Sequence, residues 1–416
     1  MYCFYFAFFL LDDYNIMSPS IFQLQALGLQ DVYLTKEPQI NIFKYNYYRY
    51  VNFATETVKL NFNSSASFGQ KSSCEIPKRG HLLSKIHLHI RLPALVKTSG
   101  KYACWSDTIG YGIFDGPIEL QIGGVIVDRL YPQFLNAWDD LTNVNKTLGK
   151  NFMILKSDAY VSNYTNATKP VDLVIPLDFW FTKRYNLALP LLSIYQQDIK
   201  VNFKLRSFSE CINYDGVTPP STVDIITSEL YSEYIFLDDV ILKQFQEQKH
   251  QFIIEQVQYN GDEIIPSVTS NYNSDIKFNH PCKEIIFFAV ERNNIQTNNY
   301  FSYSKSSDDL PLIDEASLIL DGKYRFEKLS EFYYRTVFPD NVHSVIPIKY
   351  IYTMPFSLRP EDNQPTGSLN MSRFNDITLA LKLCNNNPSM NLYIFGISYN
   401  ILTIENGVLN LEFVYV

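Results

Sequence analysis

Short runs of alternating or continuous apolar residues dominate the chain. These runs have the length of β-strands, and clusters of Asn, Gly, Pro and Asp, which favour turns, separate them. The clearest runs are KIHLHIRL (85–92), IELQIGGVIVDRL (118–130), DIKVNFKL (198–205), SLILDG (317–322), DITLALKL (376–383) and NLYIFGISYNILTI (391–404). Many short strands of this kind predict an all-β protein built from sandwiches or jelly rolls.

Helical periodicity is confined to two short stretches, PQFLNAWDDLTNV (132–144) and DDVILKQFQEQKH (238–250). In the second stretch Ile241, Phe245 and Lys249 fall one helical turn apart, and Asp238 or Asp239 can cap the first turn. We therefore expect short helices at these two places.

Three pairs of segments repeat in the same order along the two halves of the chain. SKIHLHI (84–90) resembles KEIIFFA (283–289), LQIGGVIVDRL (120–130) resembles LILDGKYRFEKL (318–329), and QQDIKVNFKL (196–205) aligns with FNDITLALKL (374–383). The offset falls by about 20 residues along the series, which predicts a longer insertion between residues 130 and 196. The repeat predicts two tandem β domains with a boundary near 238–250. The sequence IGGV (122–125) is typical of a hairpin turn with two glycines.

Composition agrees with a large globular β protein. The 416 residues include 30 Tyr and 30 Phe, 46% hydrophobic residues and 19% charged residues. Aromatic side chains suit pleated, half-buried surfaces and large contact areas. The net charge of −8 argues against a nucleic-acid binder, which needs a basic face. The six cysteines form no CxxC pair, so we expect free buried thiols and neither a zinc nor a redox motif.

The N-terminal run MYCFYFAFFLLDDYN is strongly apolar. It is too short to span a bilayer, and it lacks the basic region of a signal peptide. A mis-assigned start upstream of Met17 and a true anchor both remain open.

Candidate catalytic chemistry is sparse. His87 and His89 form an HxH pair on one face of a strand, a spacing that some β-barrels use for a metal. Pro93 and Ala94 stand where the usual companion carboxylate would be, so we expect paired structural histidines. No GxSxG, P-loop or GxGxxG motif occurs. We therefore predict no catalytic residue, no cofactor and no bound metal.

One stretch, PFSLRPEDNQPTGSLNMSRFND (355–376), gathers charged and hydroxyl side chains as an active site would. Its prolines and its glycine exclude a plain helix or a central strand. Pro360 and Pro365 fix φ, and Gly367 can adopt a positive φ. We interpret this segment, called the corner below, as a structural corner or subunit contact; a ligand site is the alternative. Arg359 and Arg373 are expected to pair with nearby acids, with Glu361 as the acid considered for Arg373.

Six segments resemble the major capsid proteins of nucleocytoplasmic large DNA viruses of the iridovirus, phycodnavirus and mimivirus kind. They run in order along the chain from residue 24 to its end. The segments are LQALGLQDVYLTKEPQINIFKYNYYRYVNFATETVKLNF (24–62), IPLDFWFTKRYNLALPLLSIYQQDIKVNF (175–203), YIFLDDVILKQFQEQKHQFIIEQVQYNG (234–261), FNHPCKEIIF (278–287), IYTMPFSLRPEDNQPTGSLNMSRFNDITL (351–379) and LYIFGISYNILTIENGVLNLEF (392–413).

The resemblance implies two tandem eight-stranded jelly rolls with short helices in the loops and linker. The expected parts are an N-terminal arm (1–26), a first jelly roll (27–237), a linker helix (238–250) and a second jelly roll (251–416). It also implies a trimer that forms a pseudo-hexagonal capsomer of an icosahedral shell over an internal membrane. A scaffolding protein of the poxvirus type, which shares the double jelly roll, is the alternative, and a β-sandwich enzyme is the rival from another class.

The partners implied by the resemblance are two further copies of the chain, neighbouring capsomers, minor capsid or cement and penton proteins, and the internal membrane or its proteins. Direct contact with nucleic acid is not expected. The protein would be part of the virion and would assemble in the host cytoplasm. The corner residues proposed for structure or subunit contact are Arg359, Pro360, Glu361, Gln364, Pro365, Gly367, Ser372 and Arg373.

Overall fold

A computed structural model of the chain describes residues 19–39, 43, 47–62, 66–100, 102–106, 109–143, 169–247 and 249–413. The apolar run at 1–16 and residues 144–168 of the predicted insertion lie outside this range. The chain divides into two compact units, Met1–Val51 and Asn52–Val416. No helix in the described part of the chain has the length and apolar character to cross a membrane.

The first unit contains two helices of one to two turns, α1 (Pro19–Gln25) and α2 (Leu29–Thr35). The Asp31 carboxylate accepts a hydrogen bond of 2.8 Å from the backbone N–H of Gly28 at the start of α2. This contact satisfies a backbone donor that the helix itself leaves unpaired.

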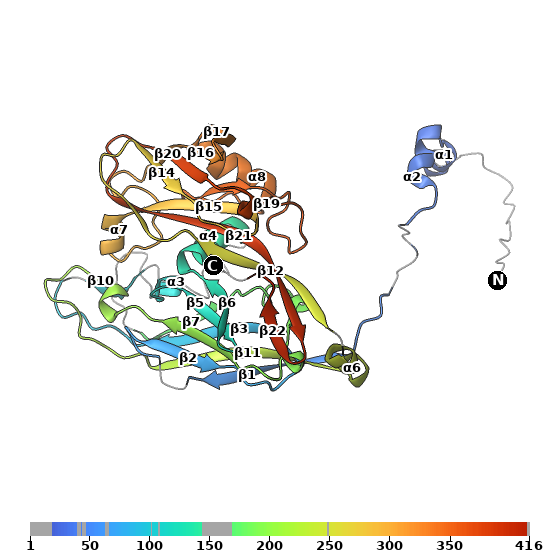
Figure 1. Cartoon of the computed structure of the whole chain (residues 1–416), viewed down its shortest axis with the longest axis horizontal. Helices are drawn as coiled ribbons and strands as arrows, with labels where there is room; N and C mark the ends of the chain where they lie inside the picture. The colour runs from blue at the N-terminus through green and yellow to red at the C-terminus, as the bar shows by residue number, and fades with distance from the viewer. Residues whose placement is uncertain are drawn as a thin grey trace. The chain divides into compact units, whose positions relative to one another are not determined.

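The second unit begins with a sandwich of two antiparallel sheets (Figure 1). One sheet has the order β1 (Phe53–Asn61), β11 (Thr227–Leu237), β3 (Leu82–Leu92), β7 (Val171–Pro176), with β8 (Leu189–Pro190) also paired to β3. The other has the order β2 (Lys71–Glu75), β9 (Ile199–Lys204), β5 (Ile118–Ile122), β6 (Val125–Leu130). A separate two-stranded ribbon joins β4 (Ala103–Trp105) to β10 (Ile212–Tyr214).

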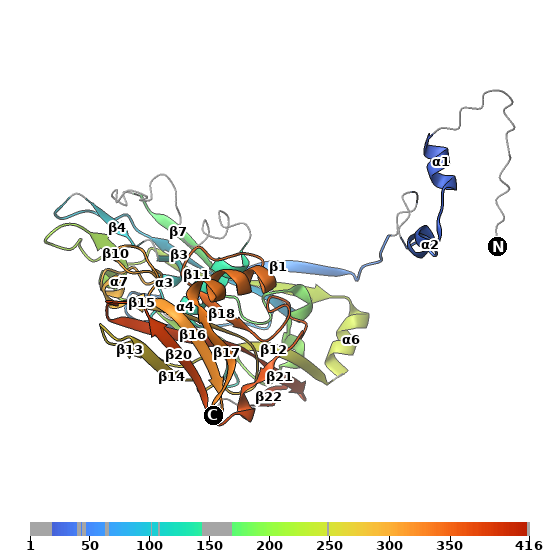
Figure 2. The same ribbon diagram turned by 90° about the horizontal axis from the view of Figure 1, so that it is seen from above.

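A second sandwich follows in the same unit. One sheet has the order β12 (His250–Tyr259), β21 (Met390–Glu405), β15 (Pro281–Glu291), β18 (Tyr352–Pro355). Short strands extend it: β13 (Glu263–Ile265) and β22 (Val408–Leu411) pair with β21, and β19 (Leu369–Asn370) pairs with β15. The other sheet, whose strands run side by side in Figure 2, has the order β14 (Asn271–Asp275), β20 (Ile377–Leu383), β16 (Ile313–Leu320), β17 (Lys323–Ser330).

The two sandwiches share one topology, which confirms the predicted internal repeat. Each of the three segment pairs found in the sequence falls on equivalent strands: β3 and β15, the β5–β6 and β16–β17 hairpins, and β9 and β20. Both hairpins turn on two residues with positive φ, Gly123 and Gly124 in the first and Asp321 and Gly322 in the second. Positive φ at both central residues is the requirement of a type I′ turn, which matches the twist of the flanking strands. The two-glycine hairpin prediction is therefore confirmed.

The strand β15 explains how the sandwiches are joined. Its continuous apolar run is buried on both faces, as expected for a strand covered on two sides. Ile285 and Phe287 point into the core of the second sandwich, whereas Ile286 and Phe288 join the cluster that fills the first. The hydrophobic core of the first sandwich therefore continues to the sheet of the second sandwich that contains β15.

Both predicted helices are present. The first is α4 (Pro132–Thr142), which lies between the two sandwiches in Figure 1. The second is α6 (Asp239–Glu247), which connects β11 to β12, and Asp238 receives backbone hydrogen bonds from Ile241 and Leu242 at its start. The other helices of the second unit within the described residues are one or two turns long: α3 (Ile109–Gly112), η1 (Tyr185–Leu187), η2 (Leu191–Ser193), η3 (Phe208–Glu210), α7 (Arg292–Gln296), η4 (Tyr333–Val337), α8 (Phe338–Val342) and η5 (Met371–Arg373).

The C-terminal hairpin β21–β22 returns to the first sandwich. Gln196 donates from its backbone N–H to Gly407 O (3.2 Å) and from its side chain to Asn406 O (3.0 Å). Gly407 has φ +84°, and a Cβ there would lie 2.5 Å from the Tyr195 ring. The hairpin turn thus requires glycine for its backbone conformation and for its close approach to the first sandwich.

Candidate functional site

The site is built around Trp138, which α4 places between the two sandwiches. Pro132 opens the helix at a position where its missing N–H costs nothing. Phe134 and Trp138, one helical turn apart, stack with ring centroids 5.9 Å apart. Phe134 also contacts Phe395 of β21 at 5.7 Å. The apolar face of α4 therefore packs against the second sandwich.

Two lysines, one from each sandwich, approach the Trp138 ring. Lys183 of the first and Lys283 of β15 each place Nζ 5.8 Å from the ring centroid, within reach of a cation–π interaction. The Lys283 side chain is fully buried, and that of Lys183 is 29% exposed. Buried ammonium groups of this kind need a counter-charge.

Glu255 of β12 supplies that counter-charge to both lysines. Its Oε2 lies 2.7 Å from Lys183 Nζ, and its Oε1 contacts Lys283 Nζ. Burial opposes ionisation of this carboxyl, but the two lysines outweigh burial and lower the pKa of Glu255. Burial lowers the pKa of Lys283 despite the neighbouring carboxylate, whereas Glu255 raises the pKa of Lys183 against the effect of burial. One carboxylate thus joins charges from both sandwiches.

His343, which follows α8, lies on the edge of the same tryptophan, with ring centroids 5.8 Å apart. Its Nε2 is 2.8 Å from Glu284 Oε1 and its Nδ1 is 3.2 Å from Glu361 Oε1. The side chains of His343 and Glu284 are fully buried. Burial disfavours the imidazolium, but the two carboxylates prevail and raise the pKa of His343 to about 9. We call Lys183, Glu255, Lys283, Glu284, His343 and Glu361 around Trp138 the charge network.

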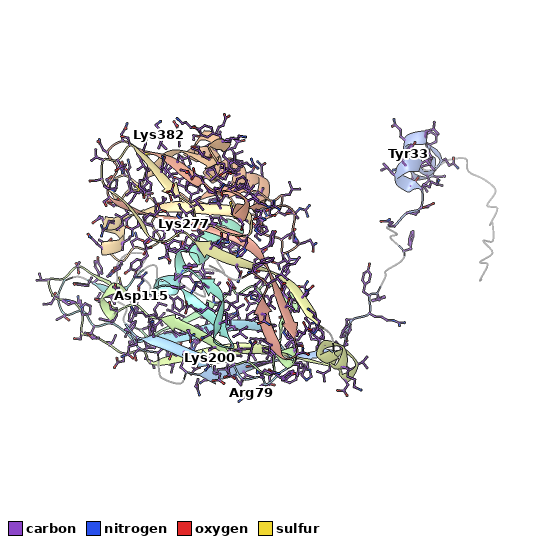
Figure 3. All side chains as sticks on the ribbon, viewed as in Figure 1. Tyr33, Arg79, Asp115, Lys200, Lys277 and Lys382 are labelled. Carbon is purple, nitrogen blue, oxygen red and sulfur yellow. The ribbon has the colours of Figure 1, made fainter. Side chains whose placement is uncertain are left out.

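Exposed ion pairs elsewhere in the second unit are different in kind. Lys382, labelled in Figure 3, lies 2.7 Å from Glu315 and 2.9 Å from Asp314 with about half of its side chain exposed. Such pairs compete with water and contribute little to stability. The charge network is distinguished by its burial and by its position between the sandwiches.

The corner meets the charge network through Glu361. Both oxygens of this carboxylate turn inward: Oε1 also accepts from Ser344 N at 2.6 Å, and Oε2 accepts from Ser344 Oγ at 2.5 Å. The structure thus gives Glu361 partners other than the Arg373 considered from the sequence. Arg359 lies 3.9 Å from Asp362, in agreement with its expected pairing, and Arg184 of the first sandwich lies 3.3 Å from the same acid.

The other predicted corner residues divide into buried and exposed ones. Pro360 is buried, whereas Arg359, Gln364, Pro365, Gly367, Ser372 and Arg373 are exposed. Gly367 has φ +142°, which confirms the predicted positive φ, and a Cβ there would lie 2.9 Å from Phe356 O. Ser372 Oγ accepts from the His280 backbone N–H at 2.9 Å. The corner is therefore held at its base and presents its tip to solvent.

Most of the network could not be predicted from the sequence. Trp138, Lys183, Glu255 and His343 come from segments far apart in the chain. The available signal was Lys283–Glu284 at the start of a continuous apolar strand, because charges in a doubly buried strand require partners.

His87 and His89 share one face of β3, as predicted, and His89 Nε2 lies 3.1 Å from Asp172 Oδ1. Within the described ranges, no group of three or more His, Cys, Asp or Glu side chains is placed to hold a metal ion. The five cysteines in those ranges are free thiols, and four of them are buried, as expected. The charges of the network are paired with one another, and the Lys183–Glu255 pair links the first sandwich to the second.

Comparisons with known proteins cover nearly the whole chain. A family profile described as "Major capsid protein N-terminus" matches residues 41–238, and one described as "Large eukaryotic DNA virus major capsid protein" matches residues 242–410. The major capsid protein of Paramecium bursaria Chlorella virus 1 is 30% identical over 393 residues, covering 88% of this chain and 87% of that protein. That of Pyramimonas orientalis virus is 29% identical over 417 residues, covering 94% and 98%.

Solved structures share the fold. The PBCV-1 virus capsid quasi-atomic model matches with a TM-score of 0.77 at 24% identity, covering 90% of this chain and 100% of that chain. The Faustovirus major capsid protein matches with a TM-score of 0.71 at 14% identity, covering 91% and 94%. At these identities the structural likeness establishes the fold, a double jelly roll, and agrees with the fold class predicted from the sequence.

Proposed function

The chain belongs to the family of large eukaryotic DNA virus major capsid proteins, and from this premise we propose that it forms trimeric capsomers of an icosahedral shell. It is a structural protein and not an enzyme. The observation that carries the proposal is the repeated topology, because two equivalent jelly rolls in each chain give six similar lobes in a trimer. Six lobes around a threefold axis make a pseudo-hexagonal block that tiles a shell.

Such a block requires the two jelly rolls of one chain to keep a fixed relation. Three features support this: the core shared through β15, the return of the β21–β22 hairpin to the first sandwich, and the charge network around Trp138. Interfaces between domains otherwise permit relative motion. The proposed function thus explains why charges are buried at this junction.

We propose the corner as a contact between subunits or capsomers. Glu361 and Pro360 anchor its base, while Arg359, Gln364, Pro365, Gly367, Ser372 and Arg373 face outward. Leu358 beside them has 76% of its surface exposed. Arginine is enriched in interface cores, and this rigid loop carries two arginines beside the exposed apolar surface of Leu358.

Further parts of the proposal follow from family membership alone. The chain would comprise an arm (1–26), two jelly rolls (27–237 and 251–416) and a linker helix (238–250). Its partners would be neighbouring capsomers, minor capsid or cement and penton proteins, and an internal membrane or its proteins, without direct contact to nucleic acid. The protein belongs to the virion capsid, and we propose that it assembles in the host cytoplasm without a cofactor.

Light scattering tests the oligomeric state. The purified protein at micromolar concentration in non-denaturing buffer should have three times the chain mass of 48.3 kDa. Electron micrographs of the same sample should show hexagonal outlines. A species of 48.3 kDa alone would contradict the trimer.

A pair of variants tests the corner. Arg359→Ala combined with Arg373→Ala should lower the yield of trimers, or of assemblies of trimers, while the far-ultraviolet circular dichroism spectrum shows that the chain still folds. Lys382→Ala, which removes an exposed charge from β20 of the second sandwich, is the matched control. Equal yields for wild type, double variant and control would remove the corner from the proposed contacts.

Proteomics of mature particles separates the capsid from the scaffolding alternative. A capsid subunit should be the most abundant protein of mature virions. A scaffolding protein would be abundant in immature particles and depleted from mature ones.

A further inference from the structure

His343 has an unusual hydrogen-bonding requirement. Both of its ring nitrogens face carboxylate oxygens, Nε2 that of Glu284 and Nδ1 that of Glu361. An ionised carboxylate only accepts, so each ring nitrogen must donate. A neutral imidazole has one N–H and satisfies one of the two carboxylates. The geometry is therefore complete only when the ring carries two protons and a positive charge.

The surroundings of the ring come from three elements. Glu284 lies on β15, Glu361 lies in the corner, and Trp138 of α4 covers the ring from the side. Lys183 and Lys283 approach the same tryptophan and are paired with Glu255. The two nearest charged groups are thus both negative, and the ring has no exposed surface through which water could replace them.

We propose that His343 is a proton-operated clamp that fastens the corner to the junction of the two jelly rolls and loosens it when the ring loses a proton. The protonated ring joins β15 to the corner through two charge-assisted hydrogen bonds, which are stronger than neutral ones. The neutral ring keeps one of them. The Ser344 contacts still hold Glu361, so the corner becomes looser while the sandwiches remain folded.

The direction of the pH dependence follows from the two states of the ring. The pKa of His343 is about 9 in the folded chain against an ordinary value of 6.5. Because the folded chain binds this proton more tightly than the unfolded chain does, protonation of His343 stabilises the fold. This stabilisation is fully present below pH 6.5 and is lost as the pH rises through 9. The pKa of Glu361 is lowered from 4.5, so this carboxylate stays charged in mildly acidic solution. The clamp is closed in mild acid and opens in alkali.

Stability curves of His343→Gln and wild type test the proposal. Between about pH 6 and pH 9.5 the melting temperature of wild type should fall by roughly 2–4 °C more than that of the variant. The difference between the two proteins cancels the titration of other groups that both contain. Parallel curves for wild type and His343→Gln would overturn the clamp.

His87→Gln is the matched control. Burial lowers the pKa of His87, so its titration lies below 6.5. This variant should follow wild type above pH 6.5, whereas His343→Gln should not. A control that departs from wild type in the same alkaline range would show that loss of any histidine produces the effect, and it would equally overturn the proposal.

Hydrogen exchange locates the effect in the chain. After correction for intrinsic exchange rates, peptides that cover residues 355–367 should exchange faster at about pH 9 than at pH 7 in wild type. In His343→Gln they should exchange fast at both pH values. Unchanged protection of these residues in wild type would overturn the link to the corner.

A second variant covers the case that His343→Gln does not fold. Glu361→Gln removes one carboxylate and leaves the buried Glu284 pair, so it should lose its clamp stability at a lower pH than wild type. An unchanged alkaline midpoint in this variant would contradict the clamp. The clamp is tested by melting curves and hydrogen exchange, whereas the trimer is tested by light scattering. Failure of the trimer prediction can therefore be told apart from failure of the clamp prediction.

Discussion

The side-chain amide of Gln197 pairs with both backbone groups of Leu409, although 212 residues separate them. Its Oε1 accepts from the Leu409 N–H at 2.7 Å, and its Nε2 donates to the Leu409 carbonyl at 3.4 Å. A single side chain thus takes the place of a neighbouring strand beside β22. Through this contact the end of the chain is fastened to the first jelly roll.

We expect Gln197→Ala to weaken this fastening. The substitution leaves the N–H and C=O of Leu409, a buried residue, without a partner, which costs about 1–3 kcal/mol. The measurement is chemical denaturation of the purified chain. Gln296→Ala in α7, where the side chain is exposed, should change stability by less than about 0.5 kcal/mol. Equal stabilities of the two variants would contradict the role assigned to Gln197.

A second prediction concerns the corner. Gly367→Val places a β-branched residue at φ +142° with its Cβ 2.9 Å from Phe356 O, and we expect a loss of roughly 1–3 kcal/mol from backbone strain. Ser368→Val, which adds similar bulk at the adjacent exposed position, is the control. Thermal melting of both variants is the measurement. If Gly367→Val, Ser368→Val and wild type have the same melting temperature, the corner tolerates a side chain at this position and its shape does not depend on the glycine.

The fold could be predicted from local patterns because strands and tight turns are specified locally. Alternating residues marked the β3 strand, and the two-glycine turn at Gly123–Gly124 marked the first hairpin. The repeat then extended these local features to a second sandwich. The positive φ of Gly367 was accessible for the same reason, because a glycine after a proline in a polar loop indicates a turn.

The charge network could not be predicted in this way, because its members are brought together only by the tertiary fold. Glu255 and Glu284 lie 28 and 59 residues from their partners Lys283 and His343. Several acids close to Arg373 in the sequence made a local pair the natural expectation. Glu361 instead turns to a histidine 18 residues upstream, because β15 holds both segments: Glu284 of β15 contacts His343, and Phe356 and Ser357 of the corner donate to Lys283 O.

A third prediction compares two members of the network. Glu255→Gln leaves the buried Lys283 and the nearby Lys183 without their shared counter-charge, and we expect a cost of about 3–5 kcal/mol. Lys283→Met removes one buried cation, while Glu255 keeps Lys183 at 2.7 Å. Its cost should be smaller, about 1–2 kcal/mol.

Chemical denaturation measures the free energy of unfolding of the two variants. Lys382→Met on β20 serves as the control for loss of an exposed lysine. A larger cost for Lys283→Met than for Glu255→Gln would show that the carboxylate does not balance both lysines.

The last prediction concerns Asp128, a buried acid on β6 near the network. Its Oδ1 accepts from the Arg129 N–H at 2.8 Å, but burial raises its pKa to about 7 from an ordinary value of 3.8. When the pKa of a carboxyl is higher in the folded chain than in the unfolded chain, its ionisation destabilises the fold. This destabilisation is absent below pH 3.8 and grows until the pH exceeds 7.

Asp128→Asn keeps an oxygen acceptor and removes the ionisation, so it should raise the free energy of unfolding by about 1–3 kcal/mol at pH 8. At about pH 4 the variant should match wild type or be slightly less stable. Melting curves across this range test the sign: a variant that is destabilised equally at both pH values would show that burial does not raise the pKa of Asp128.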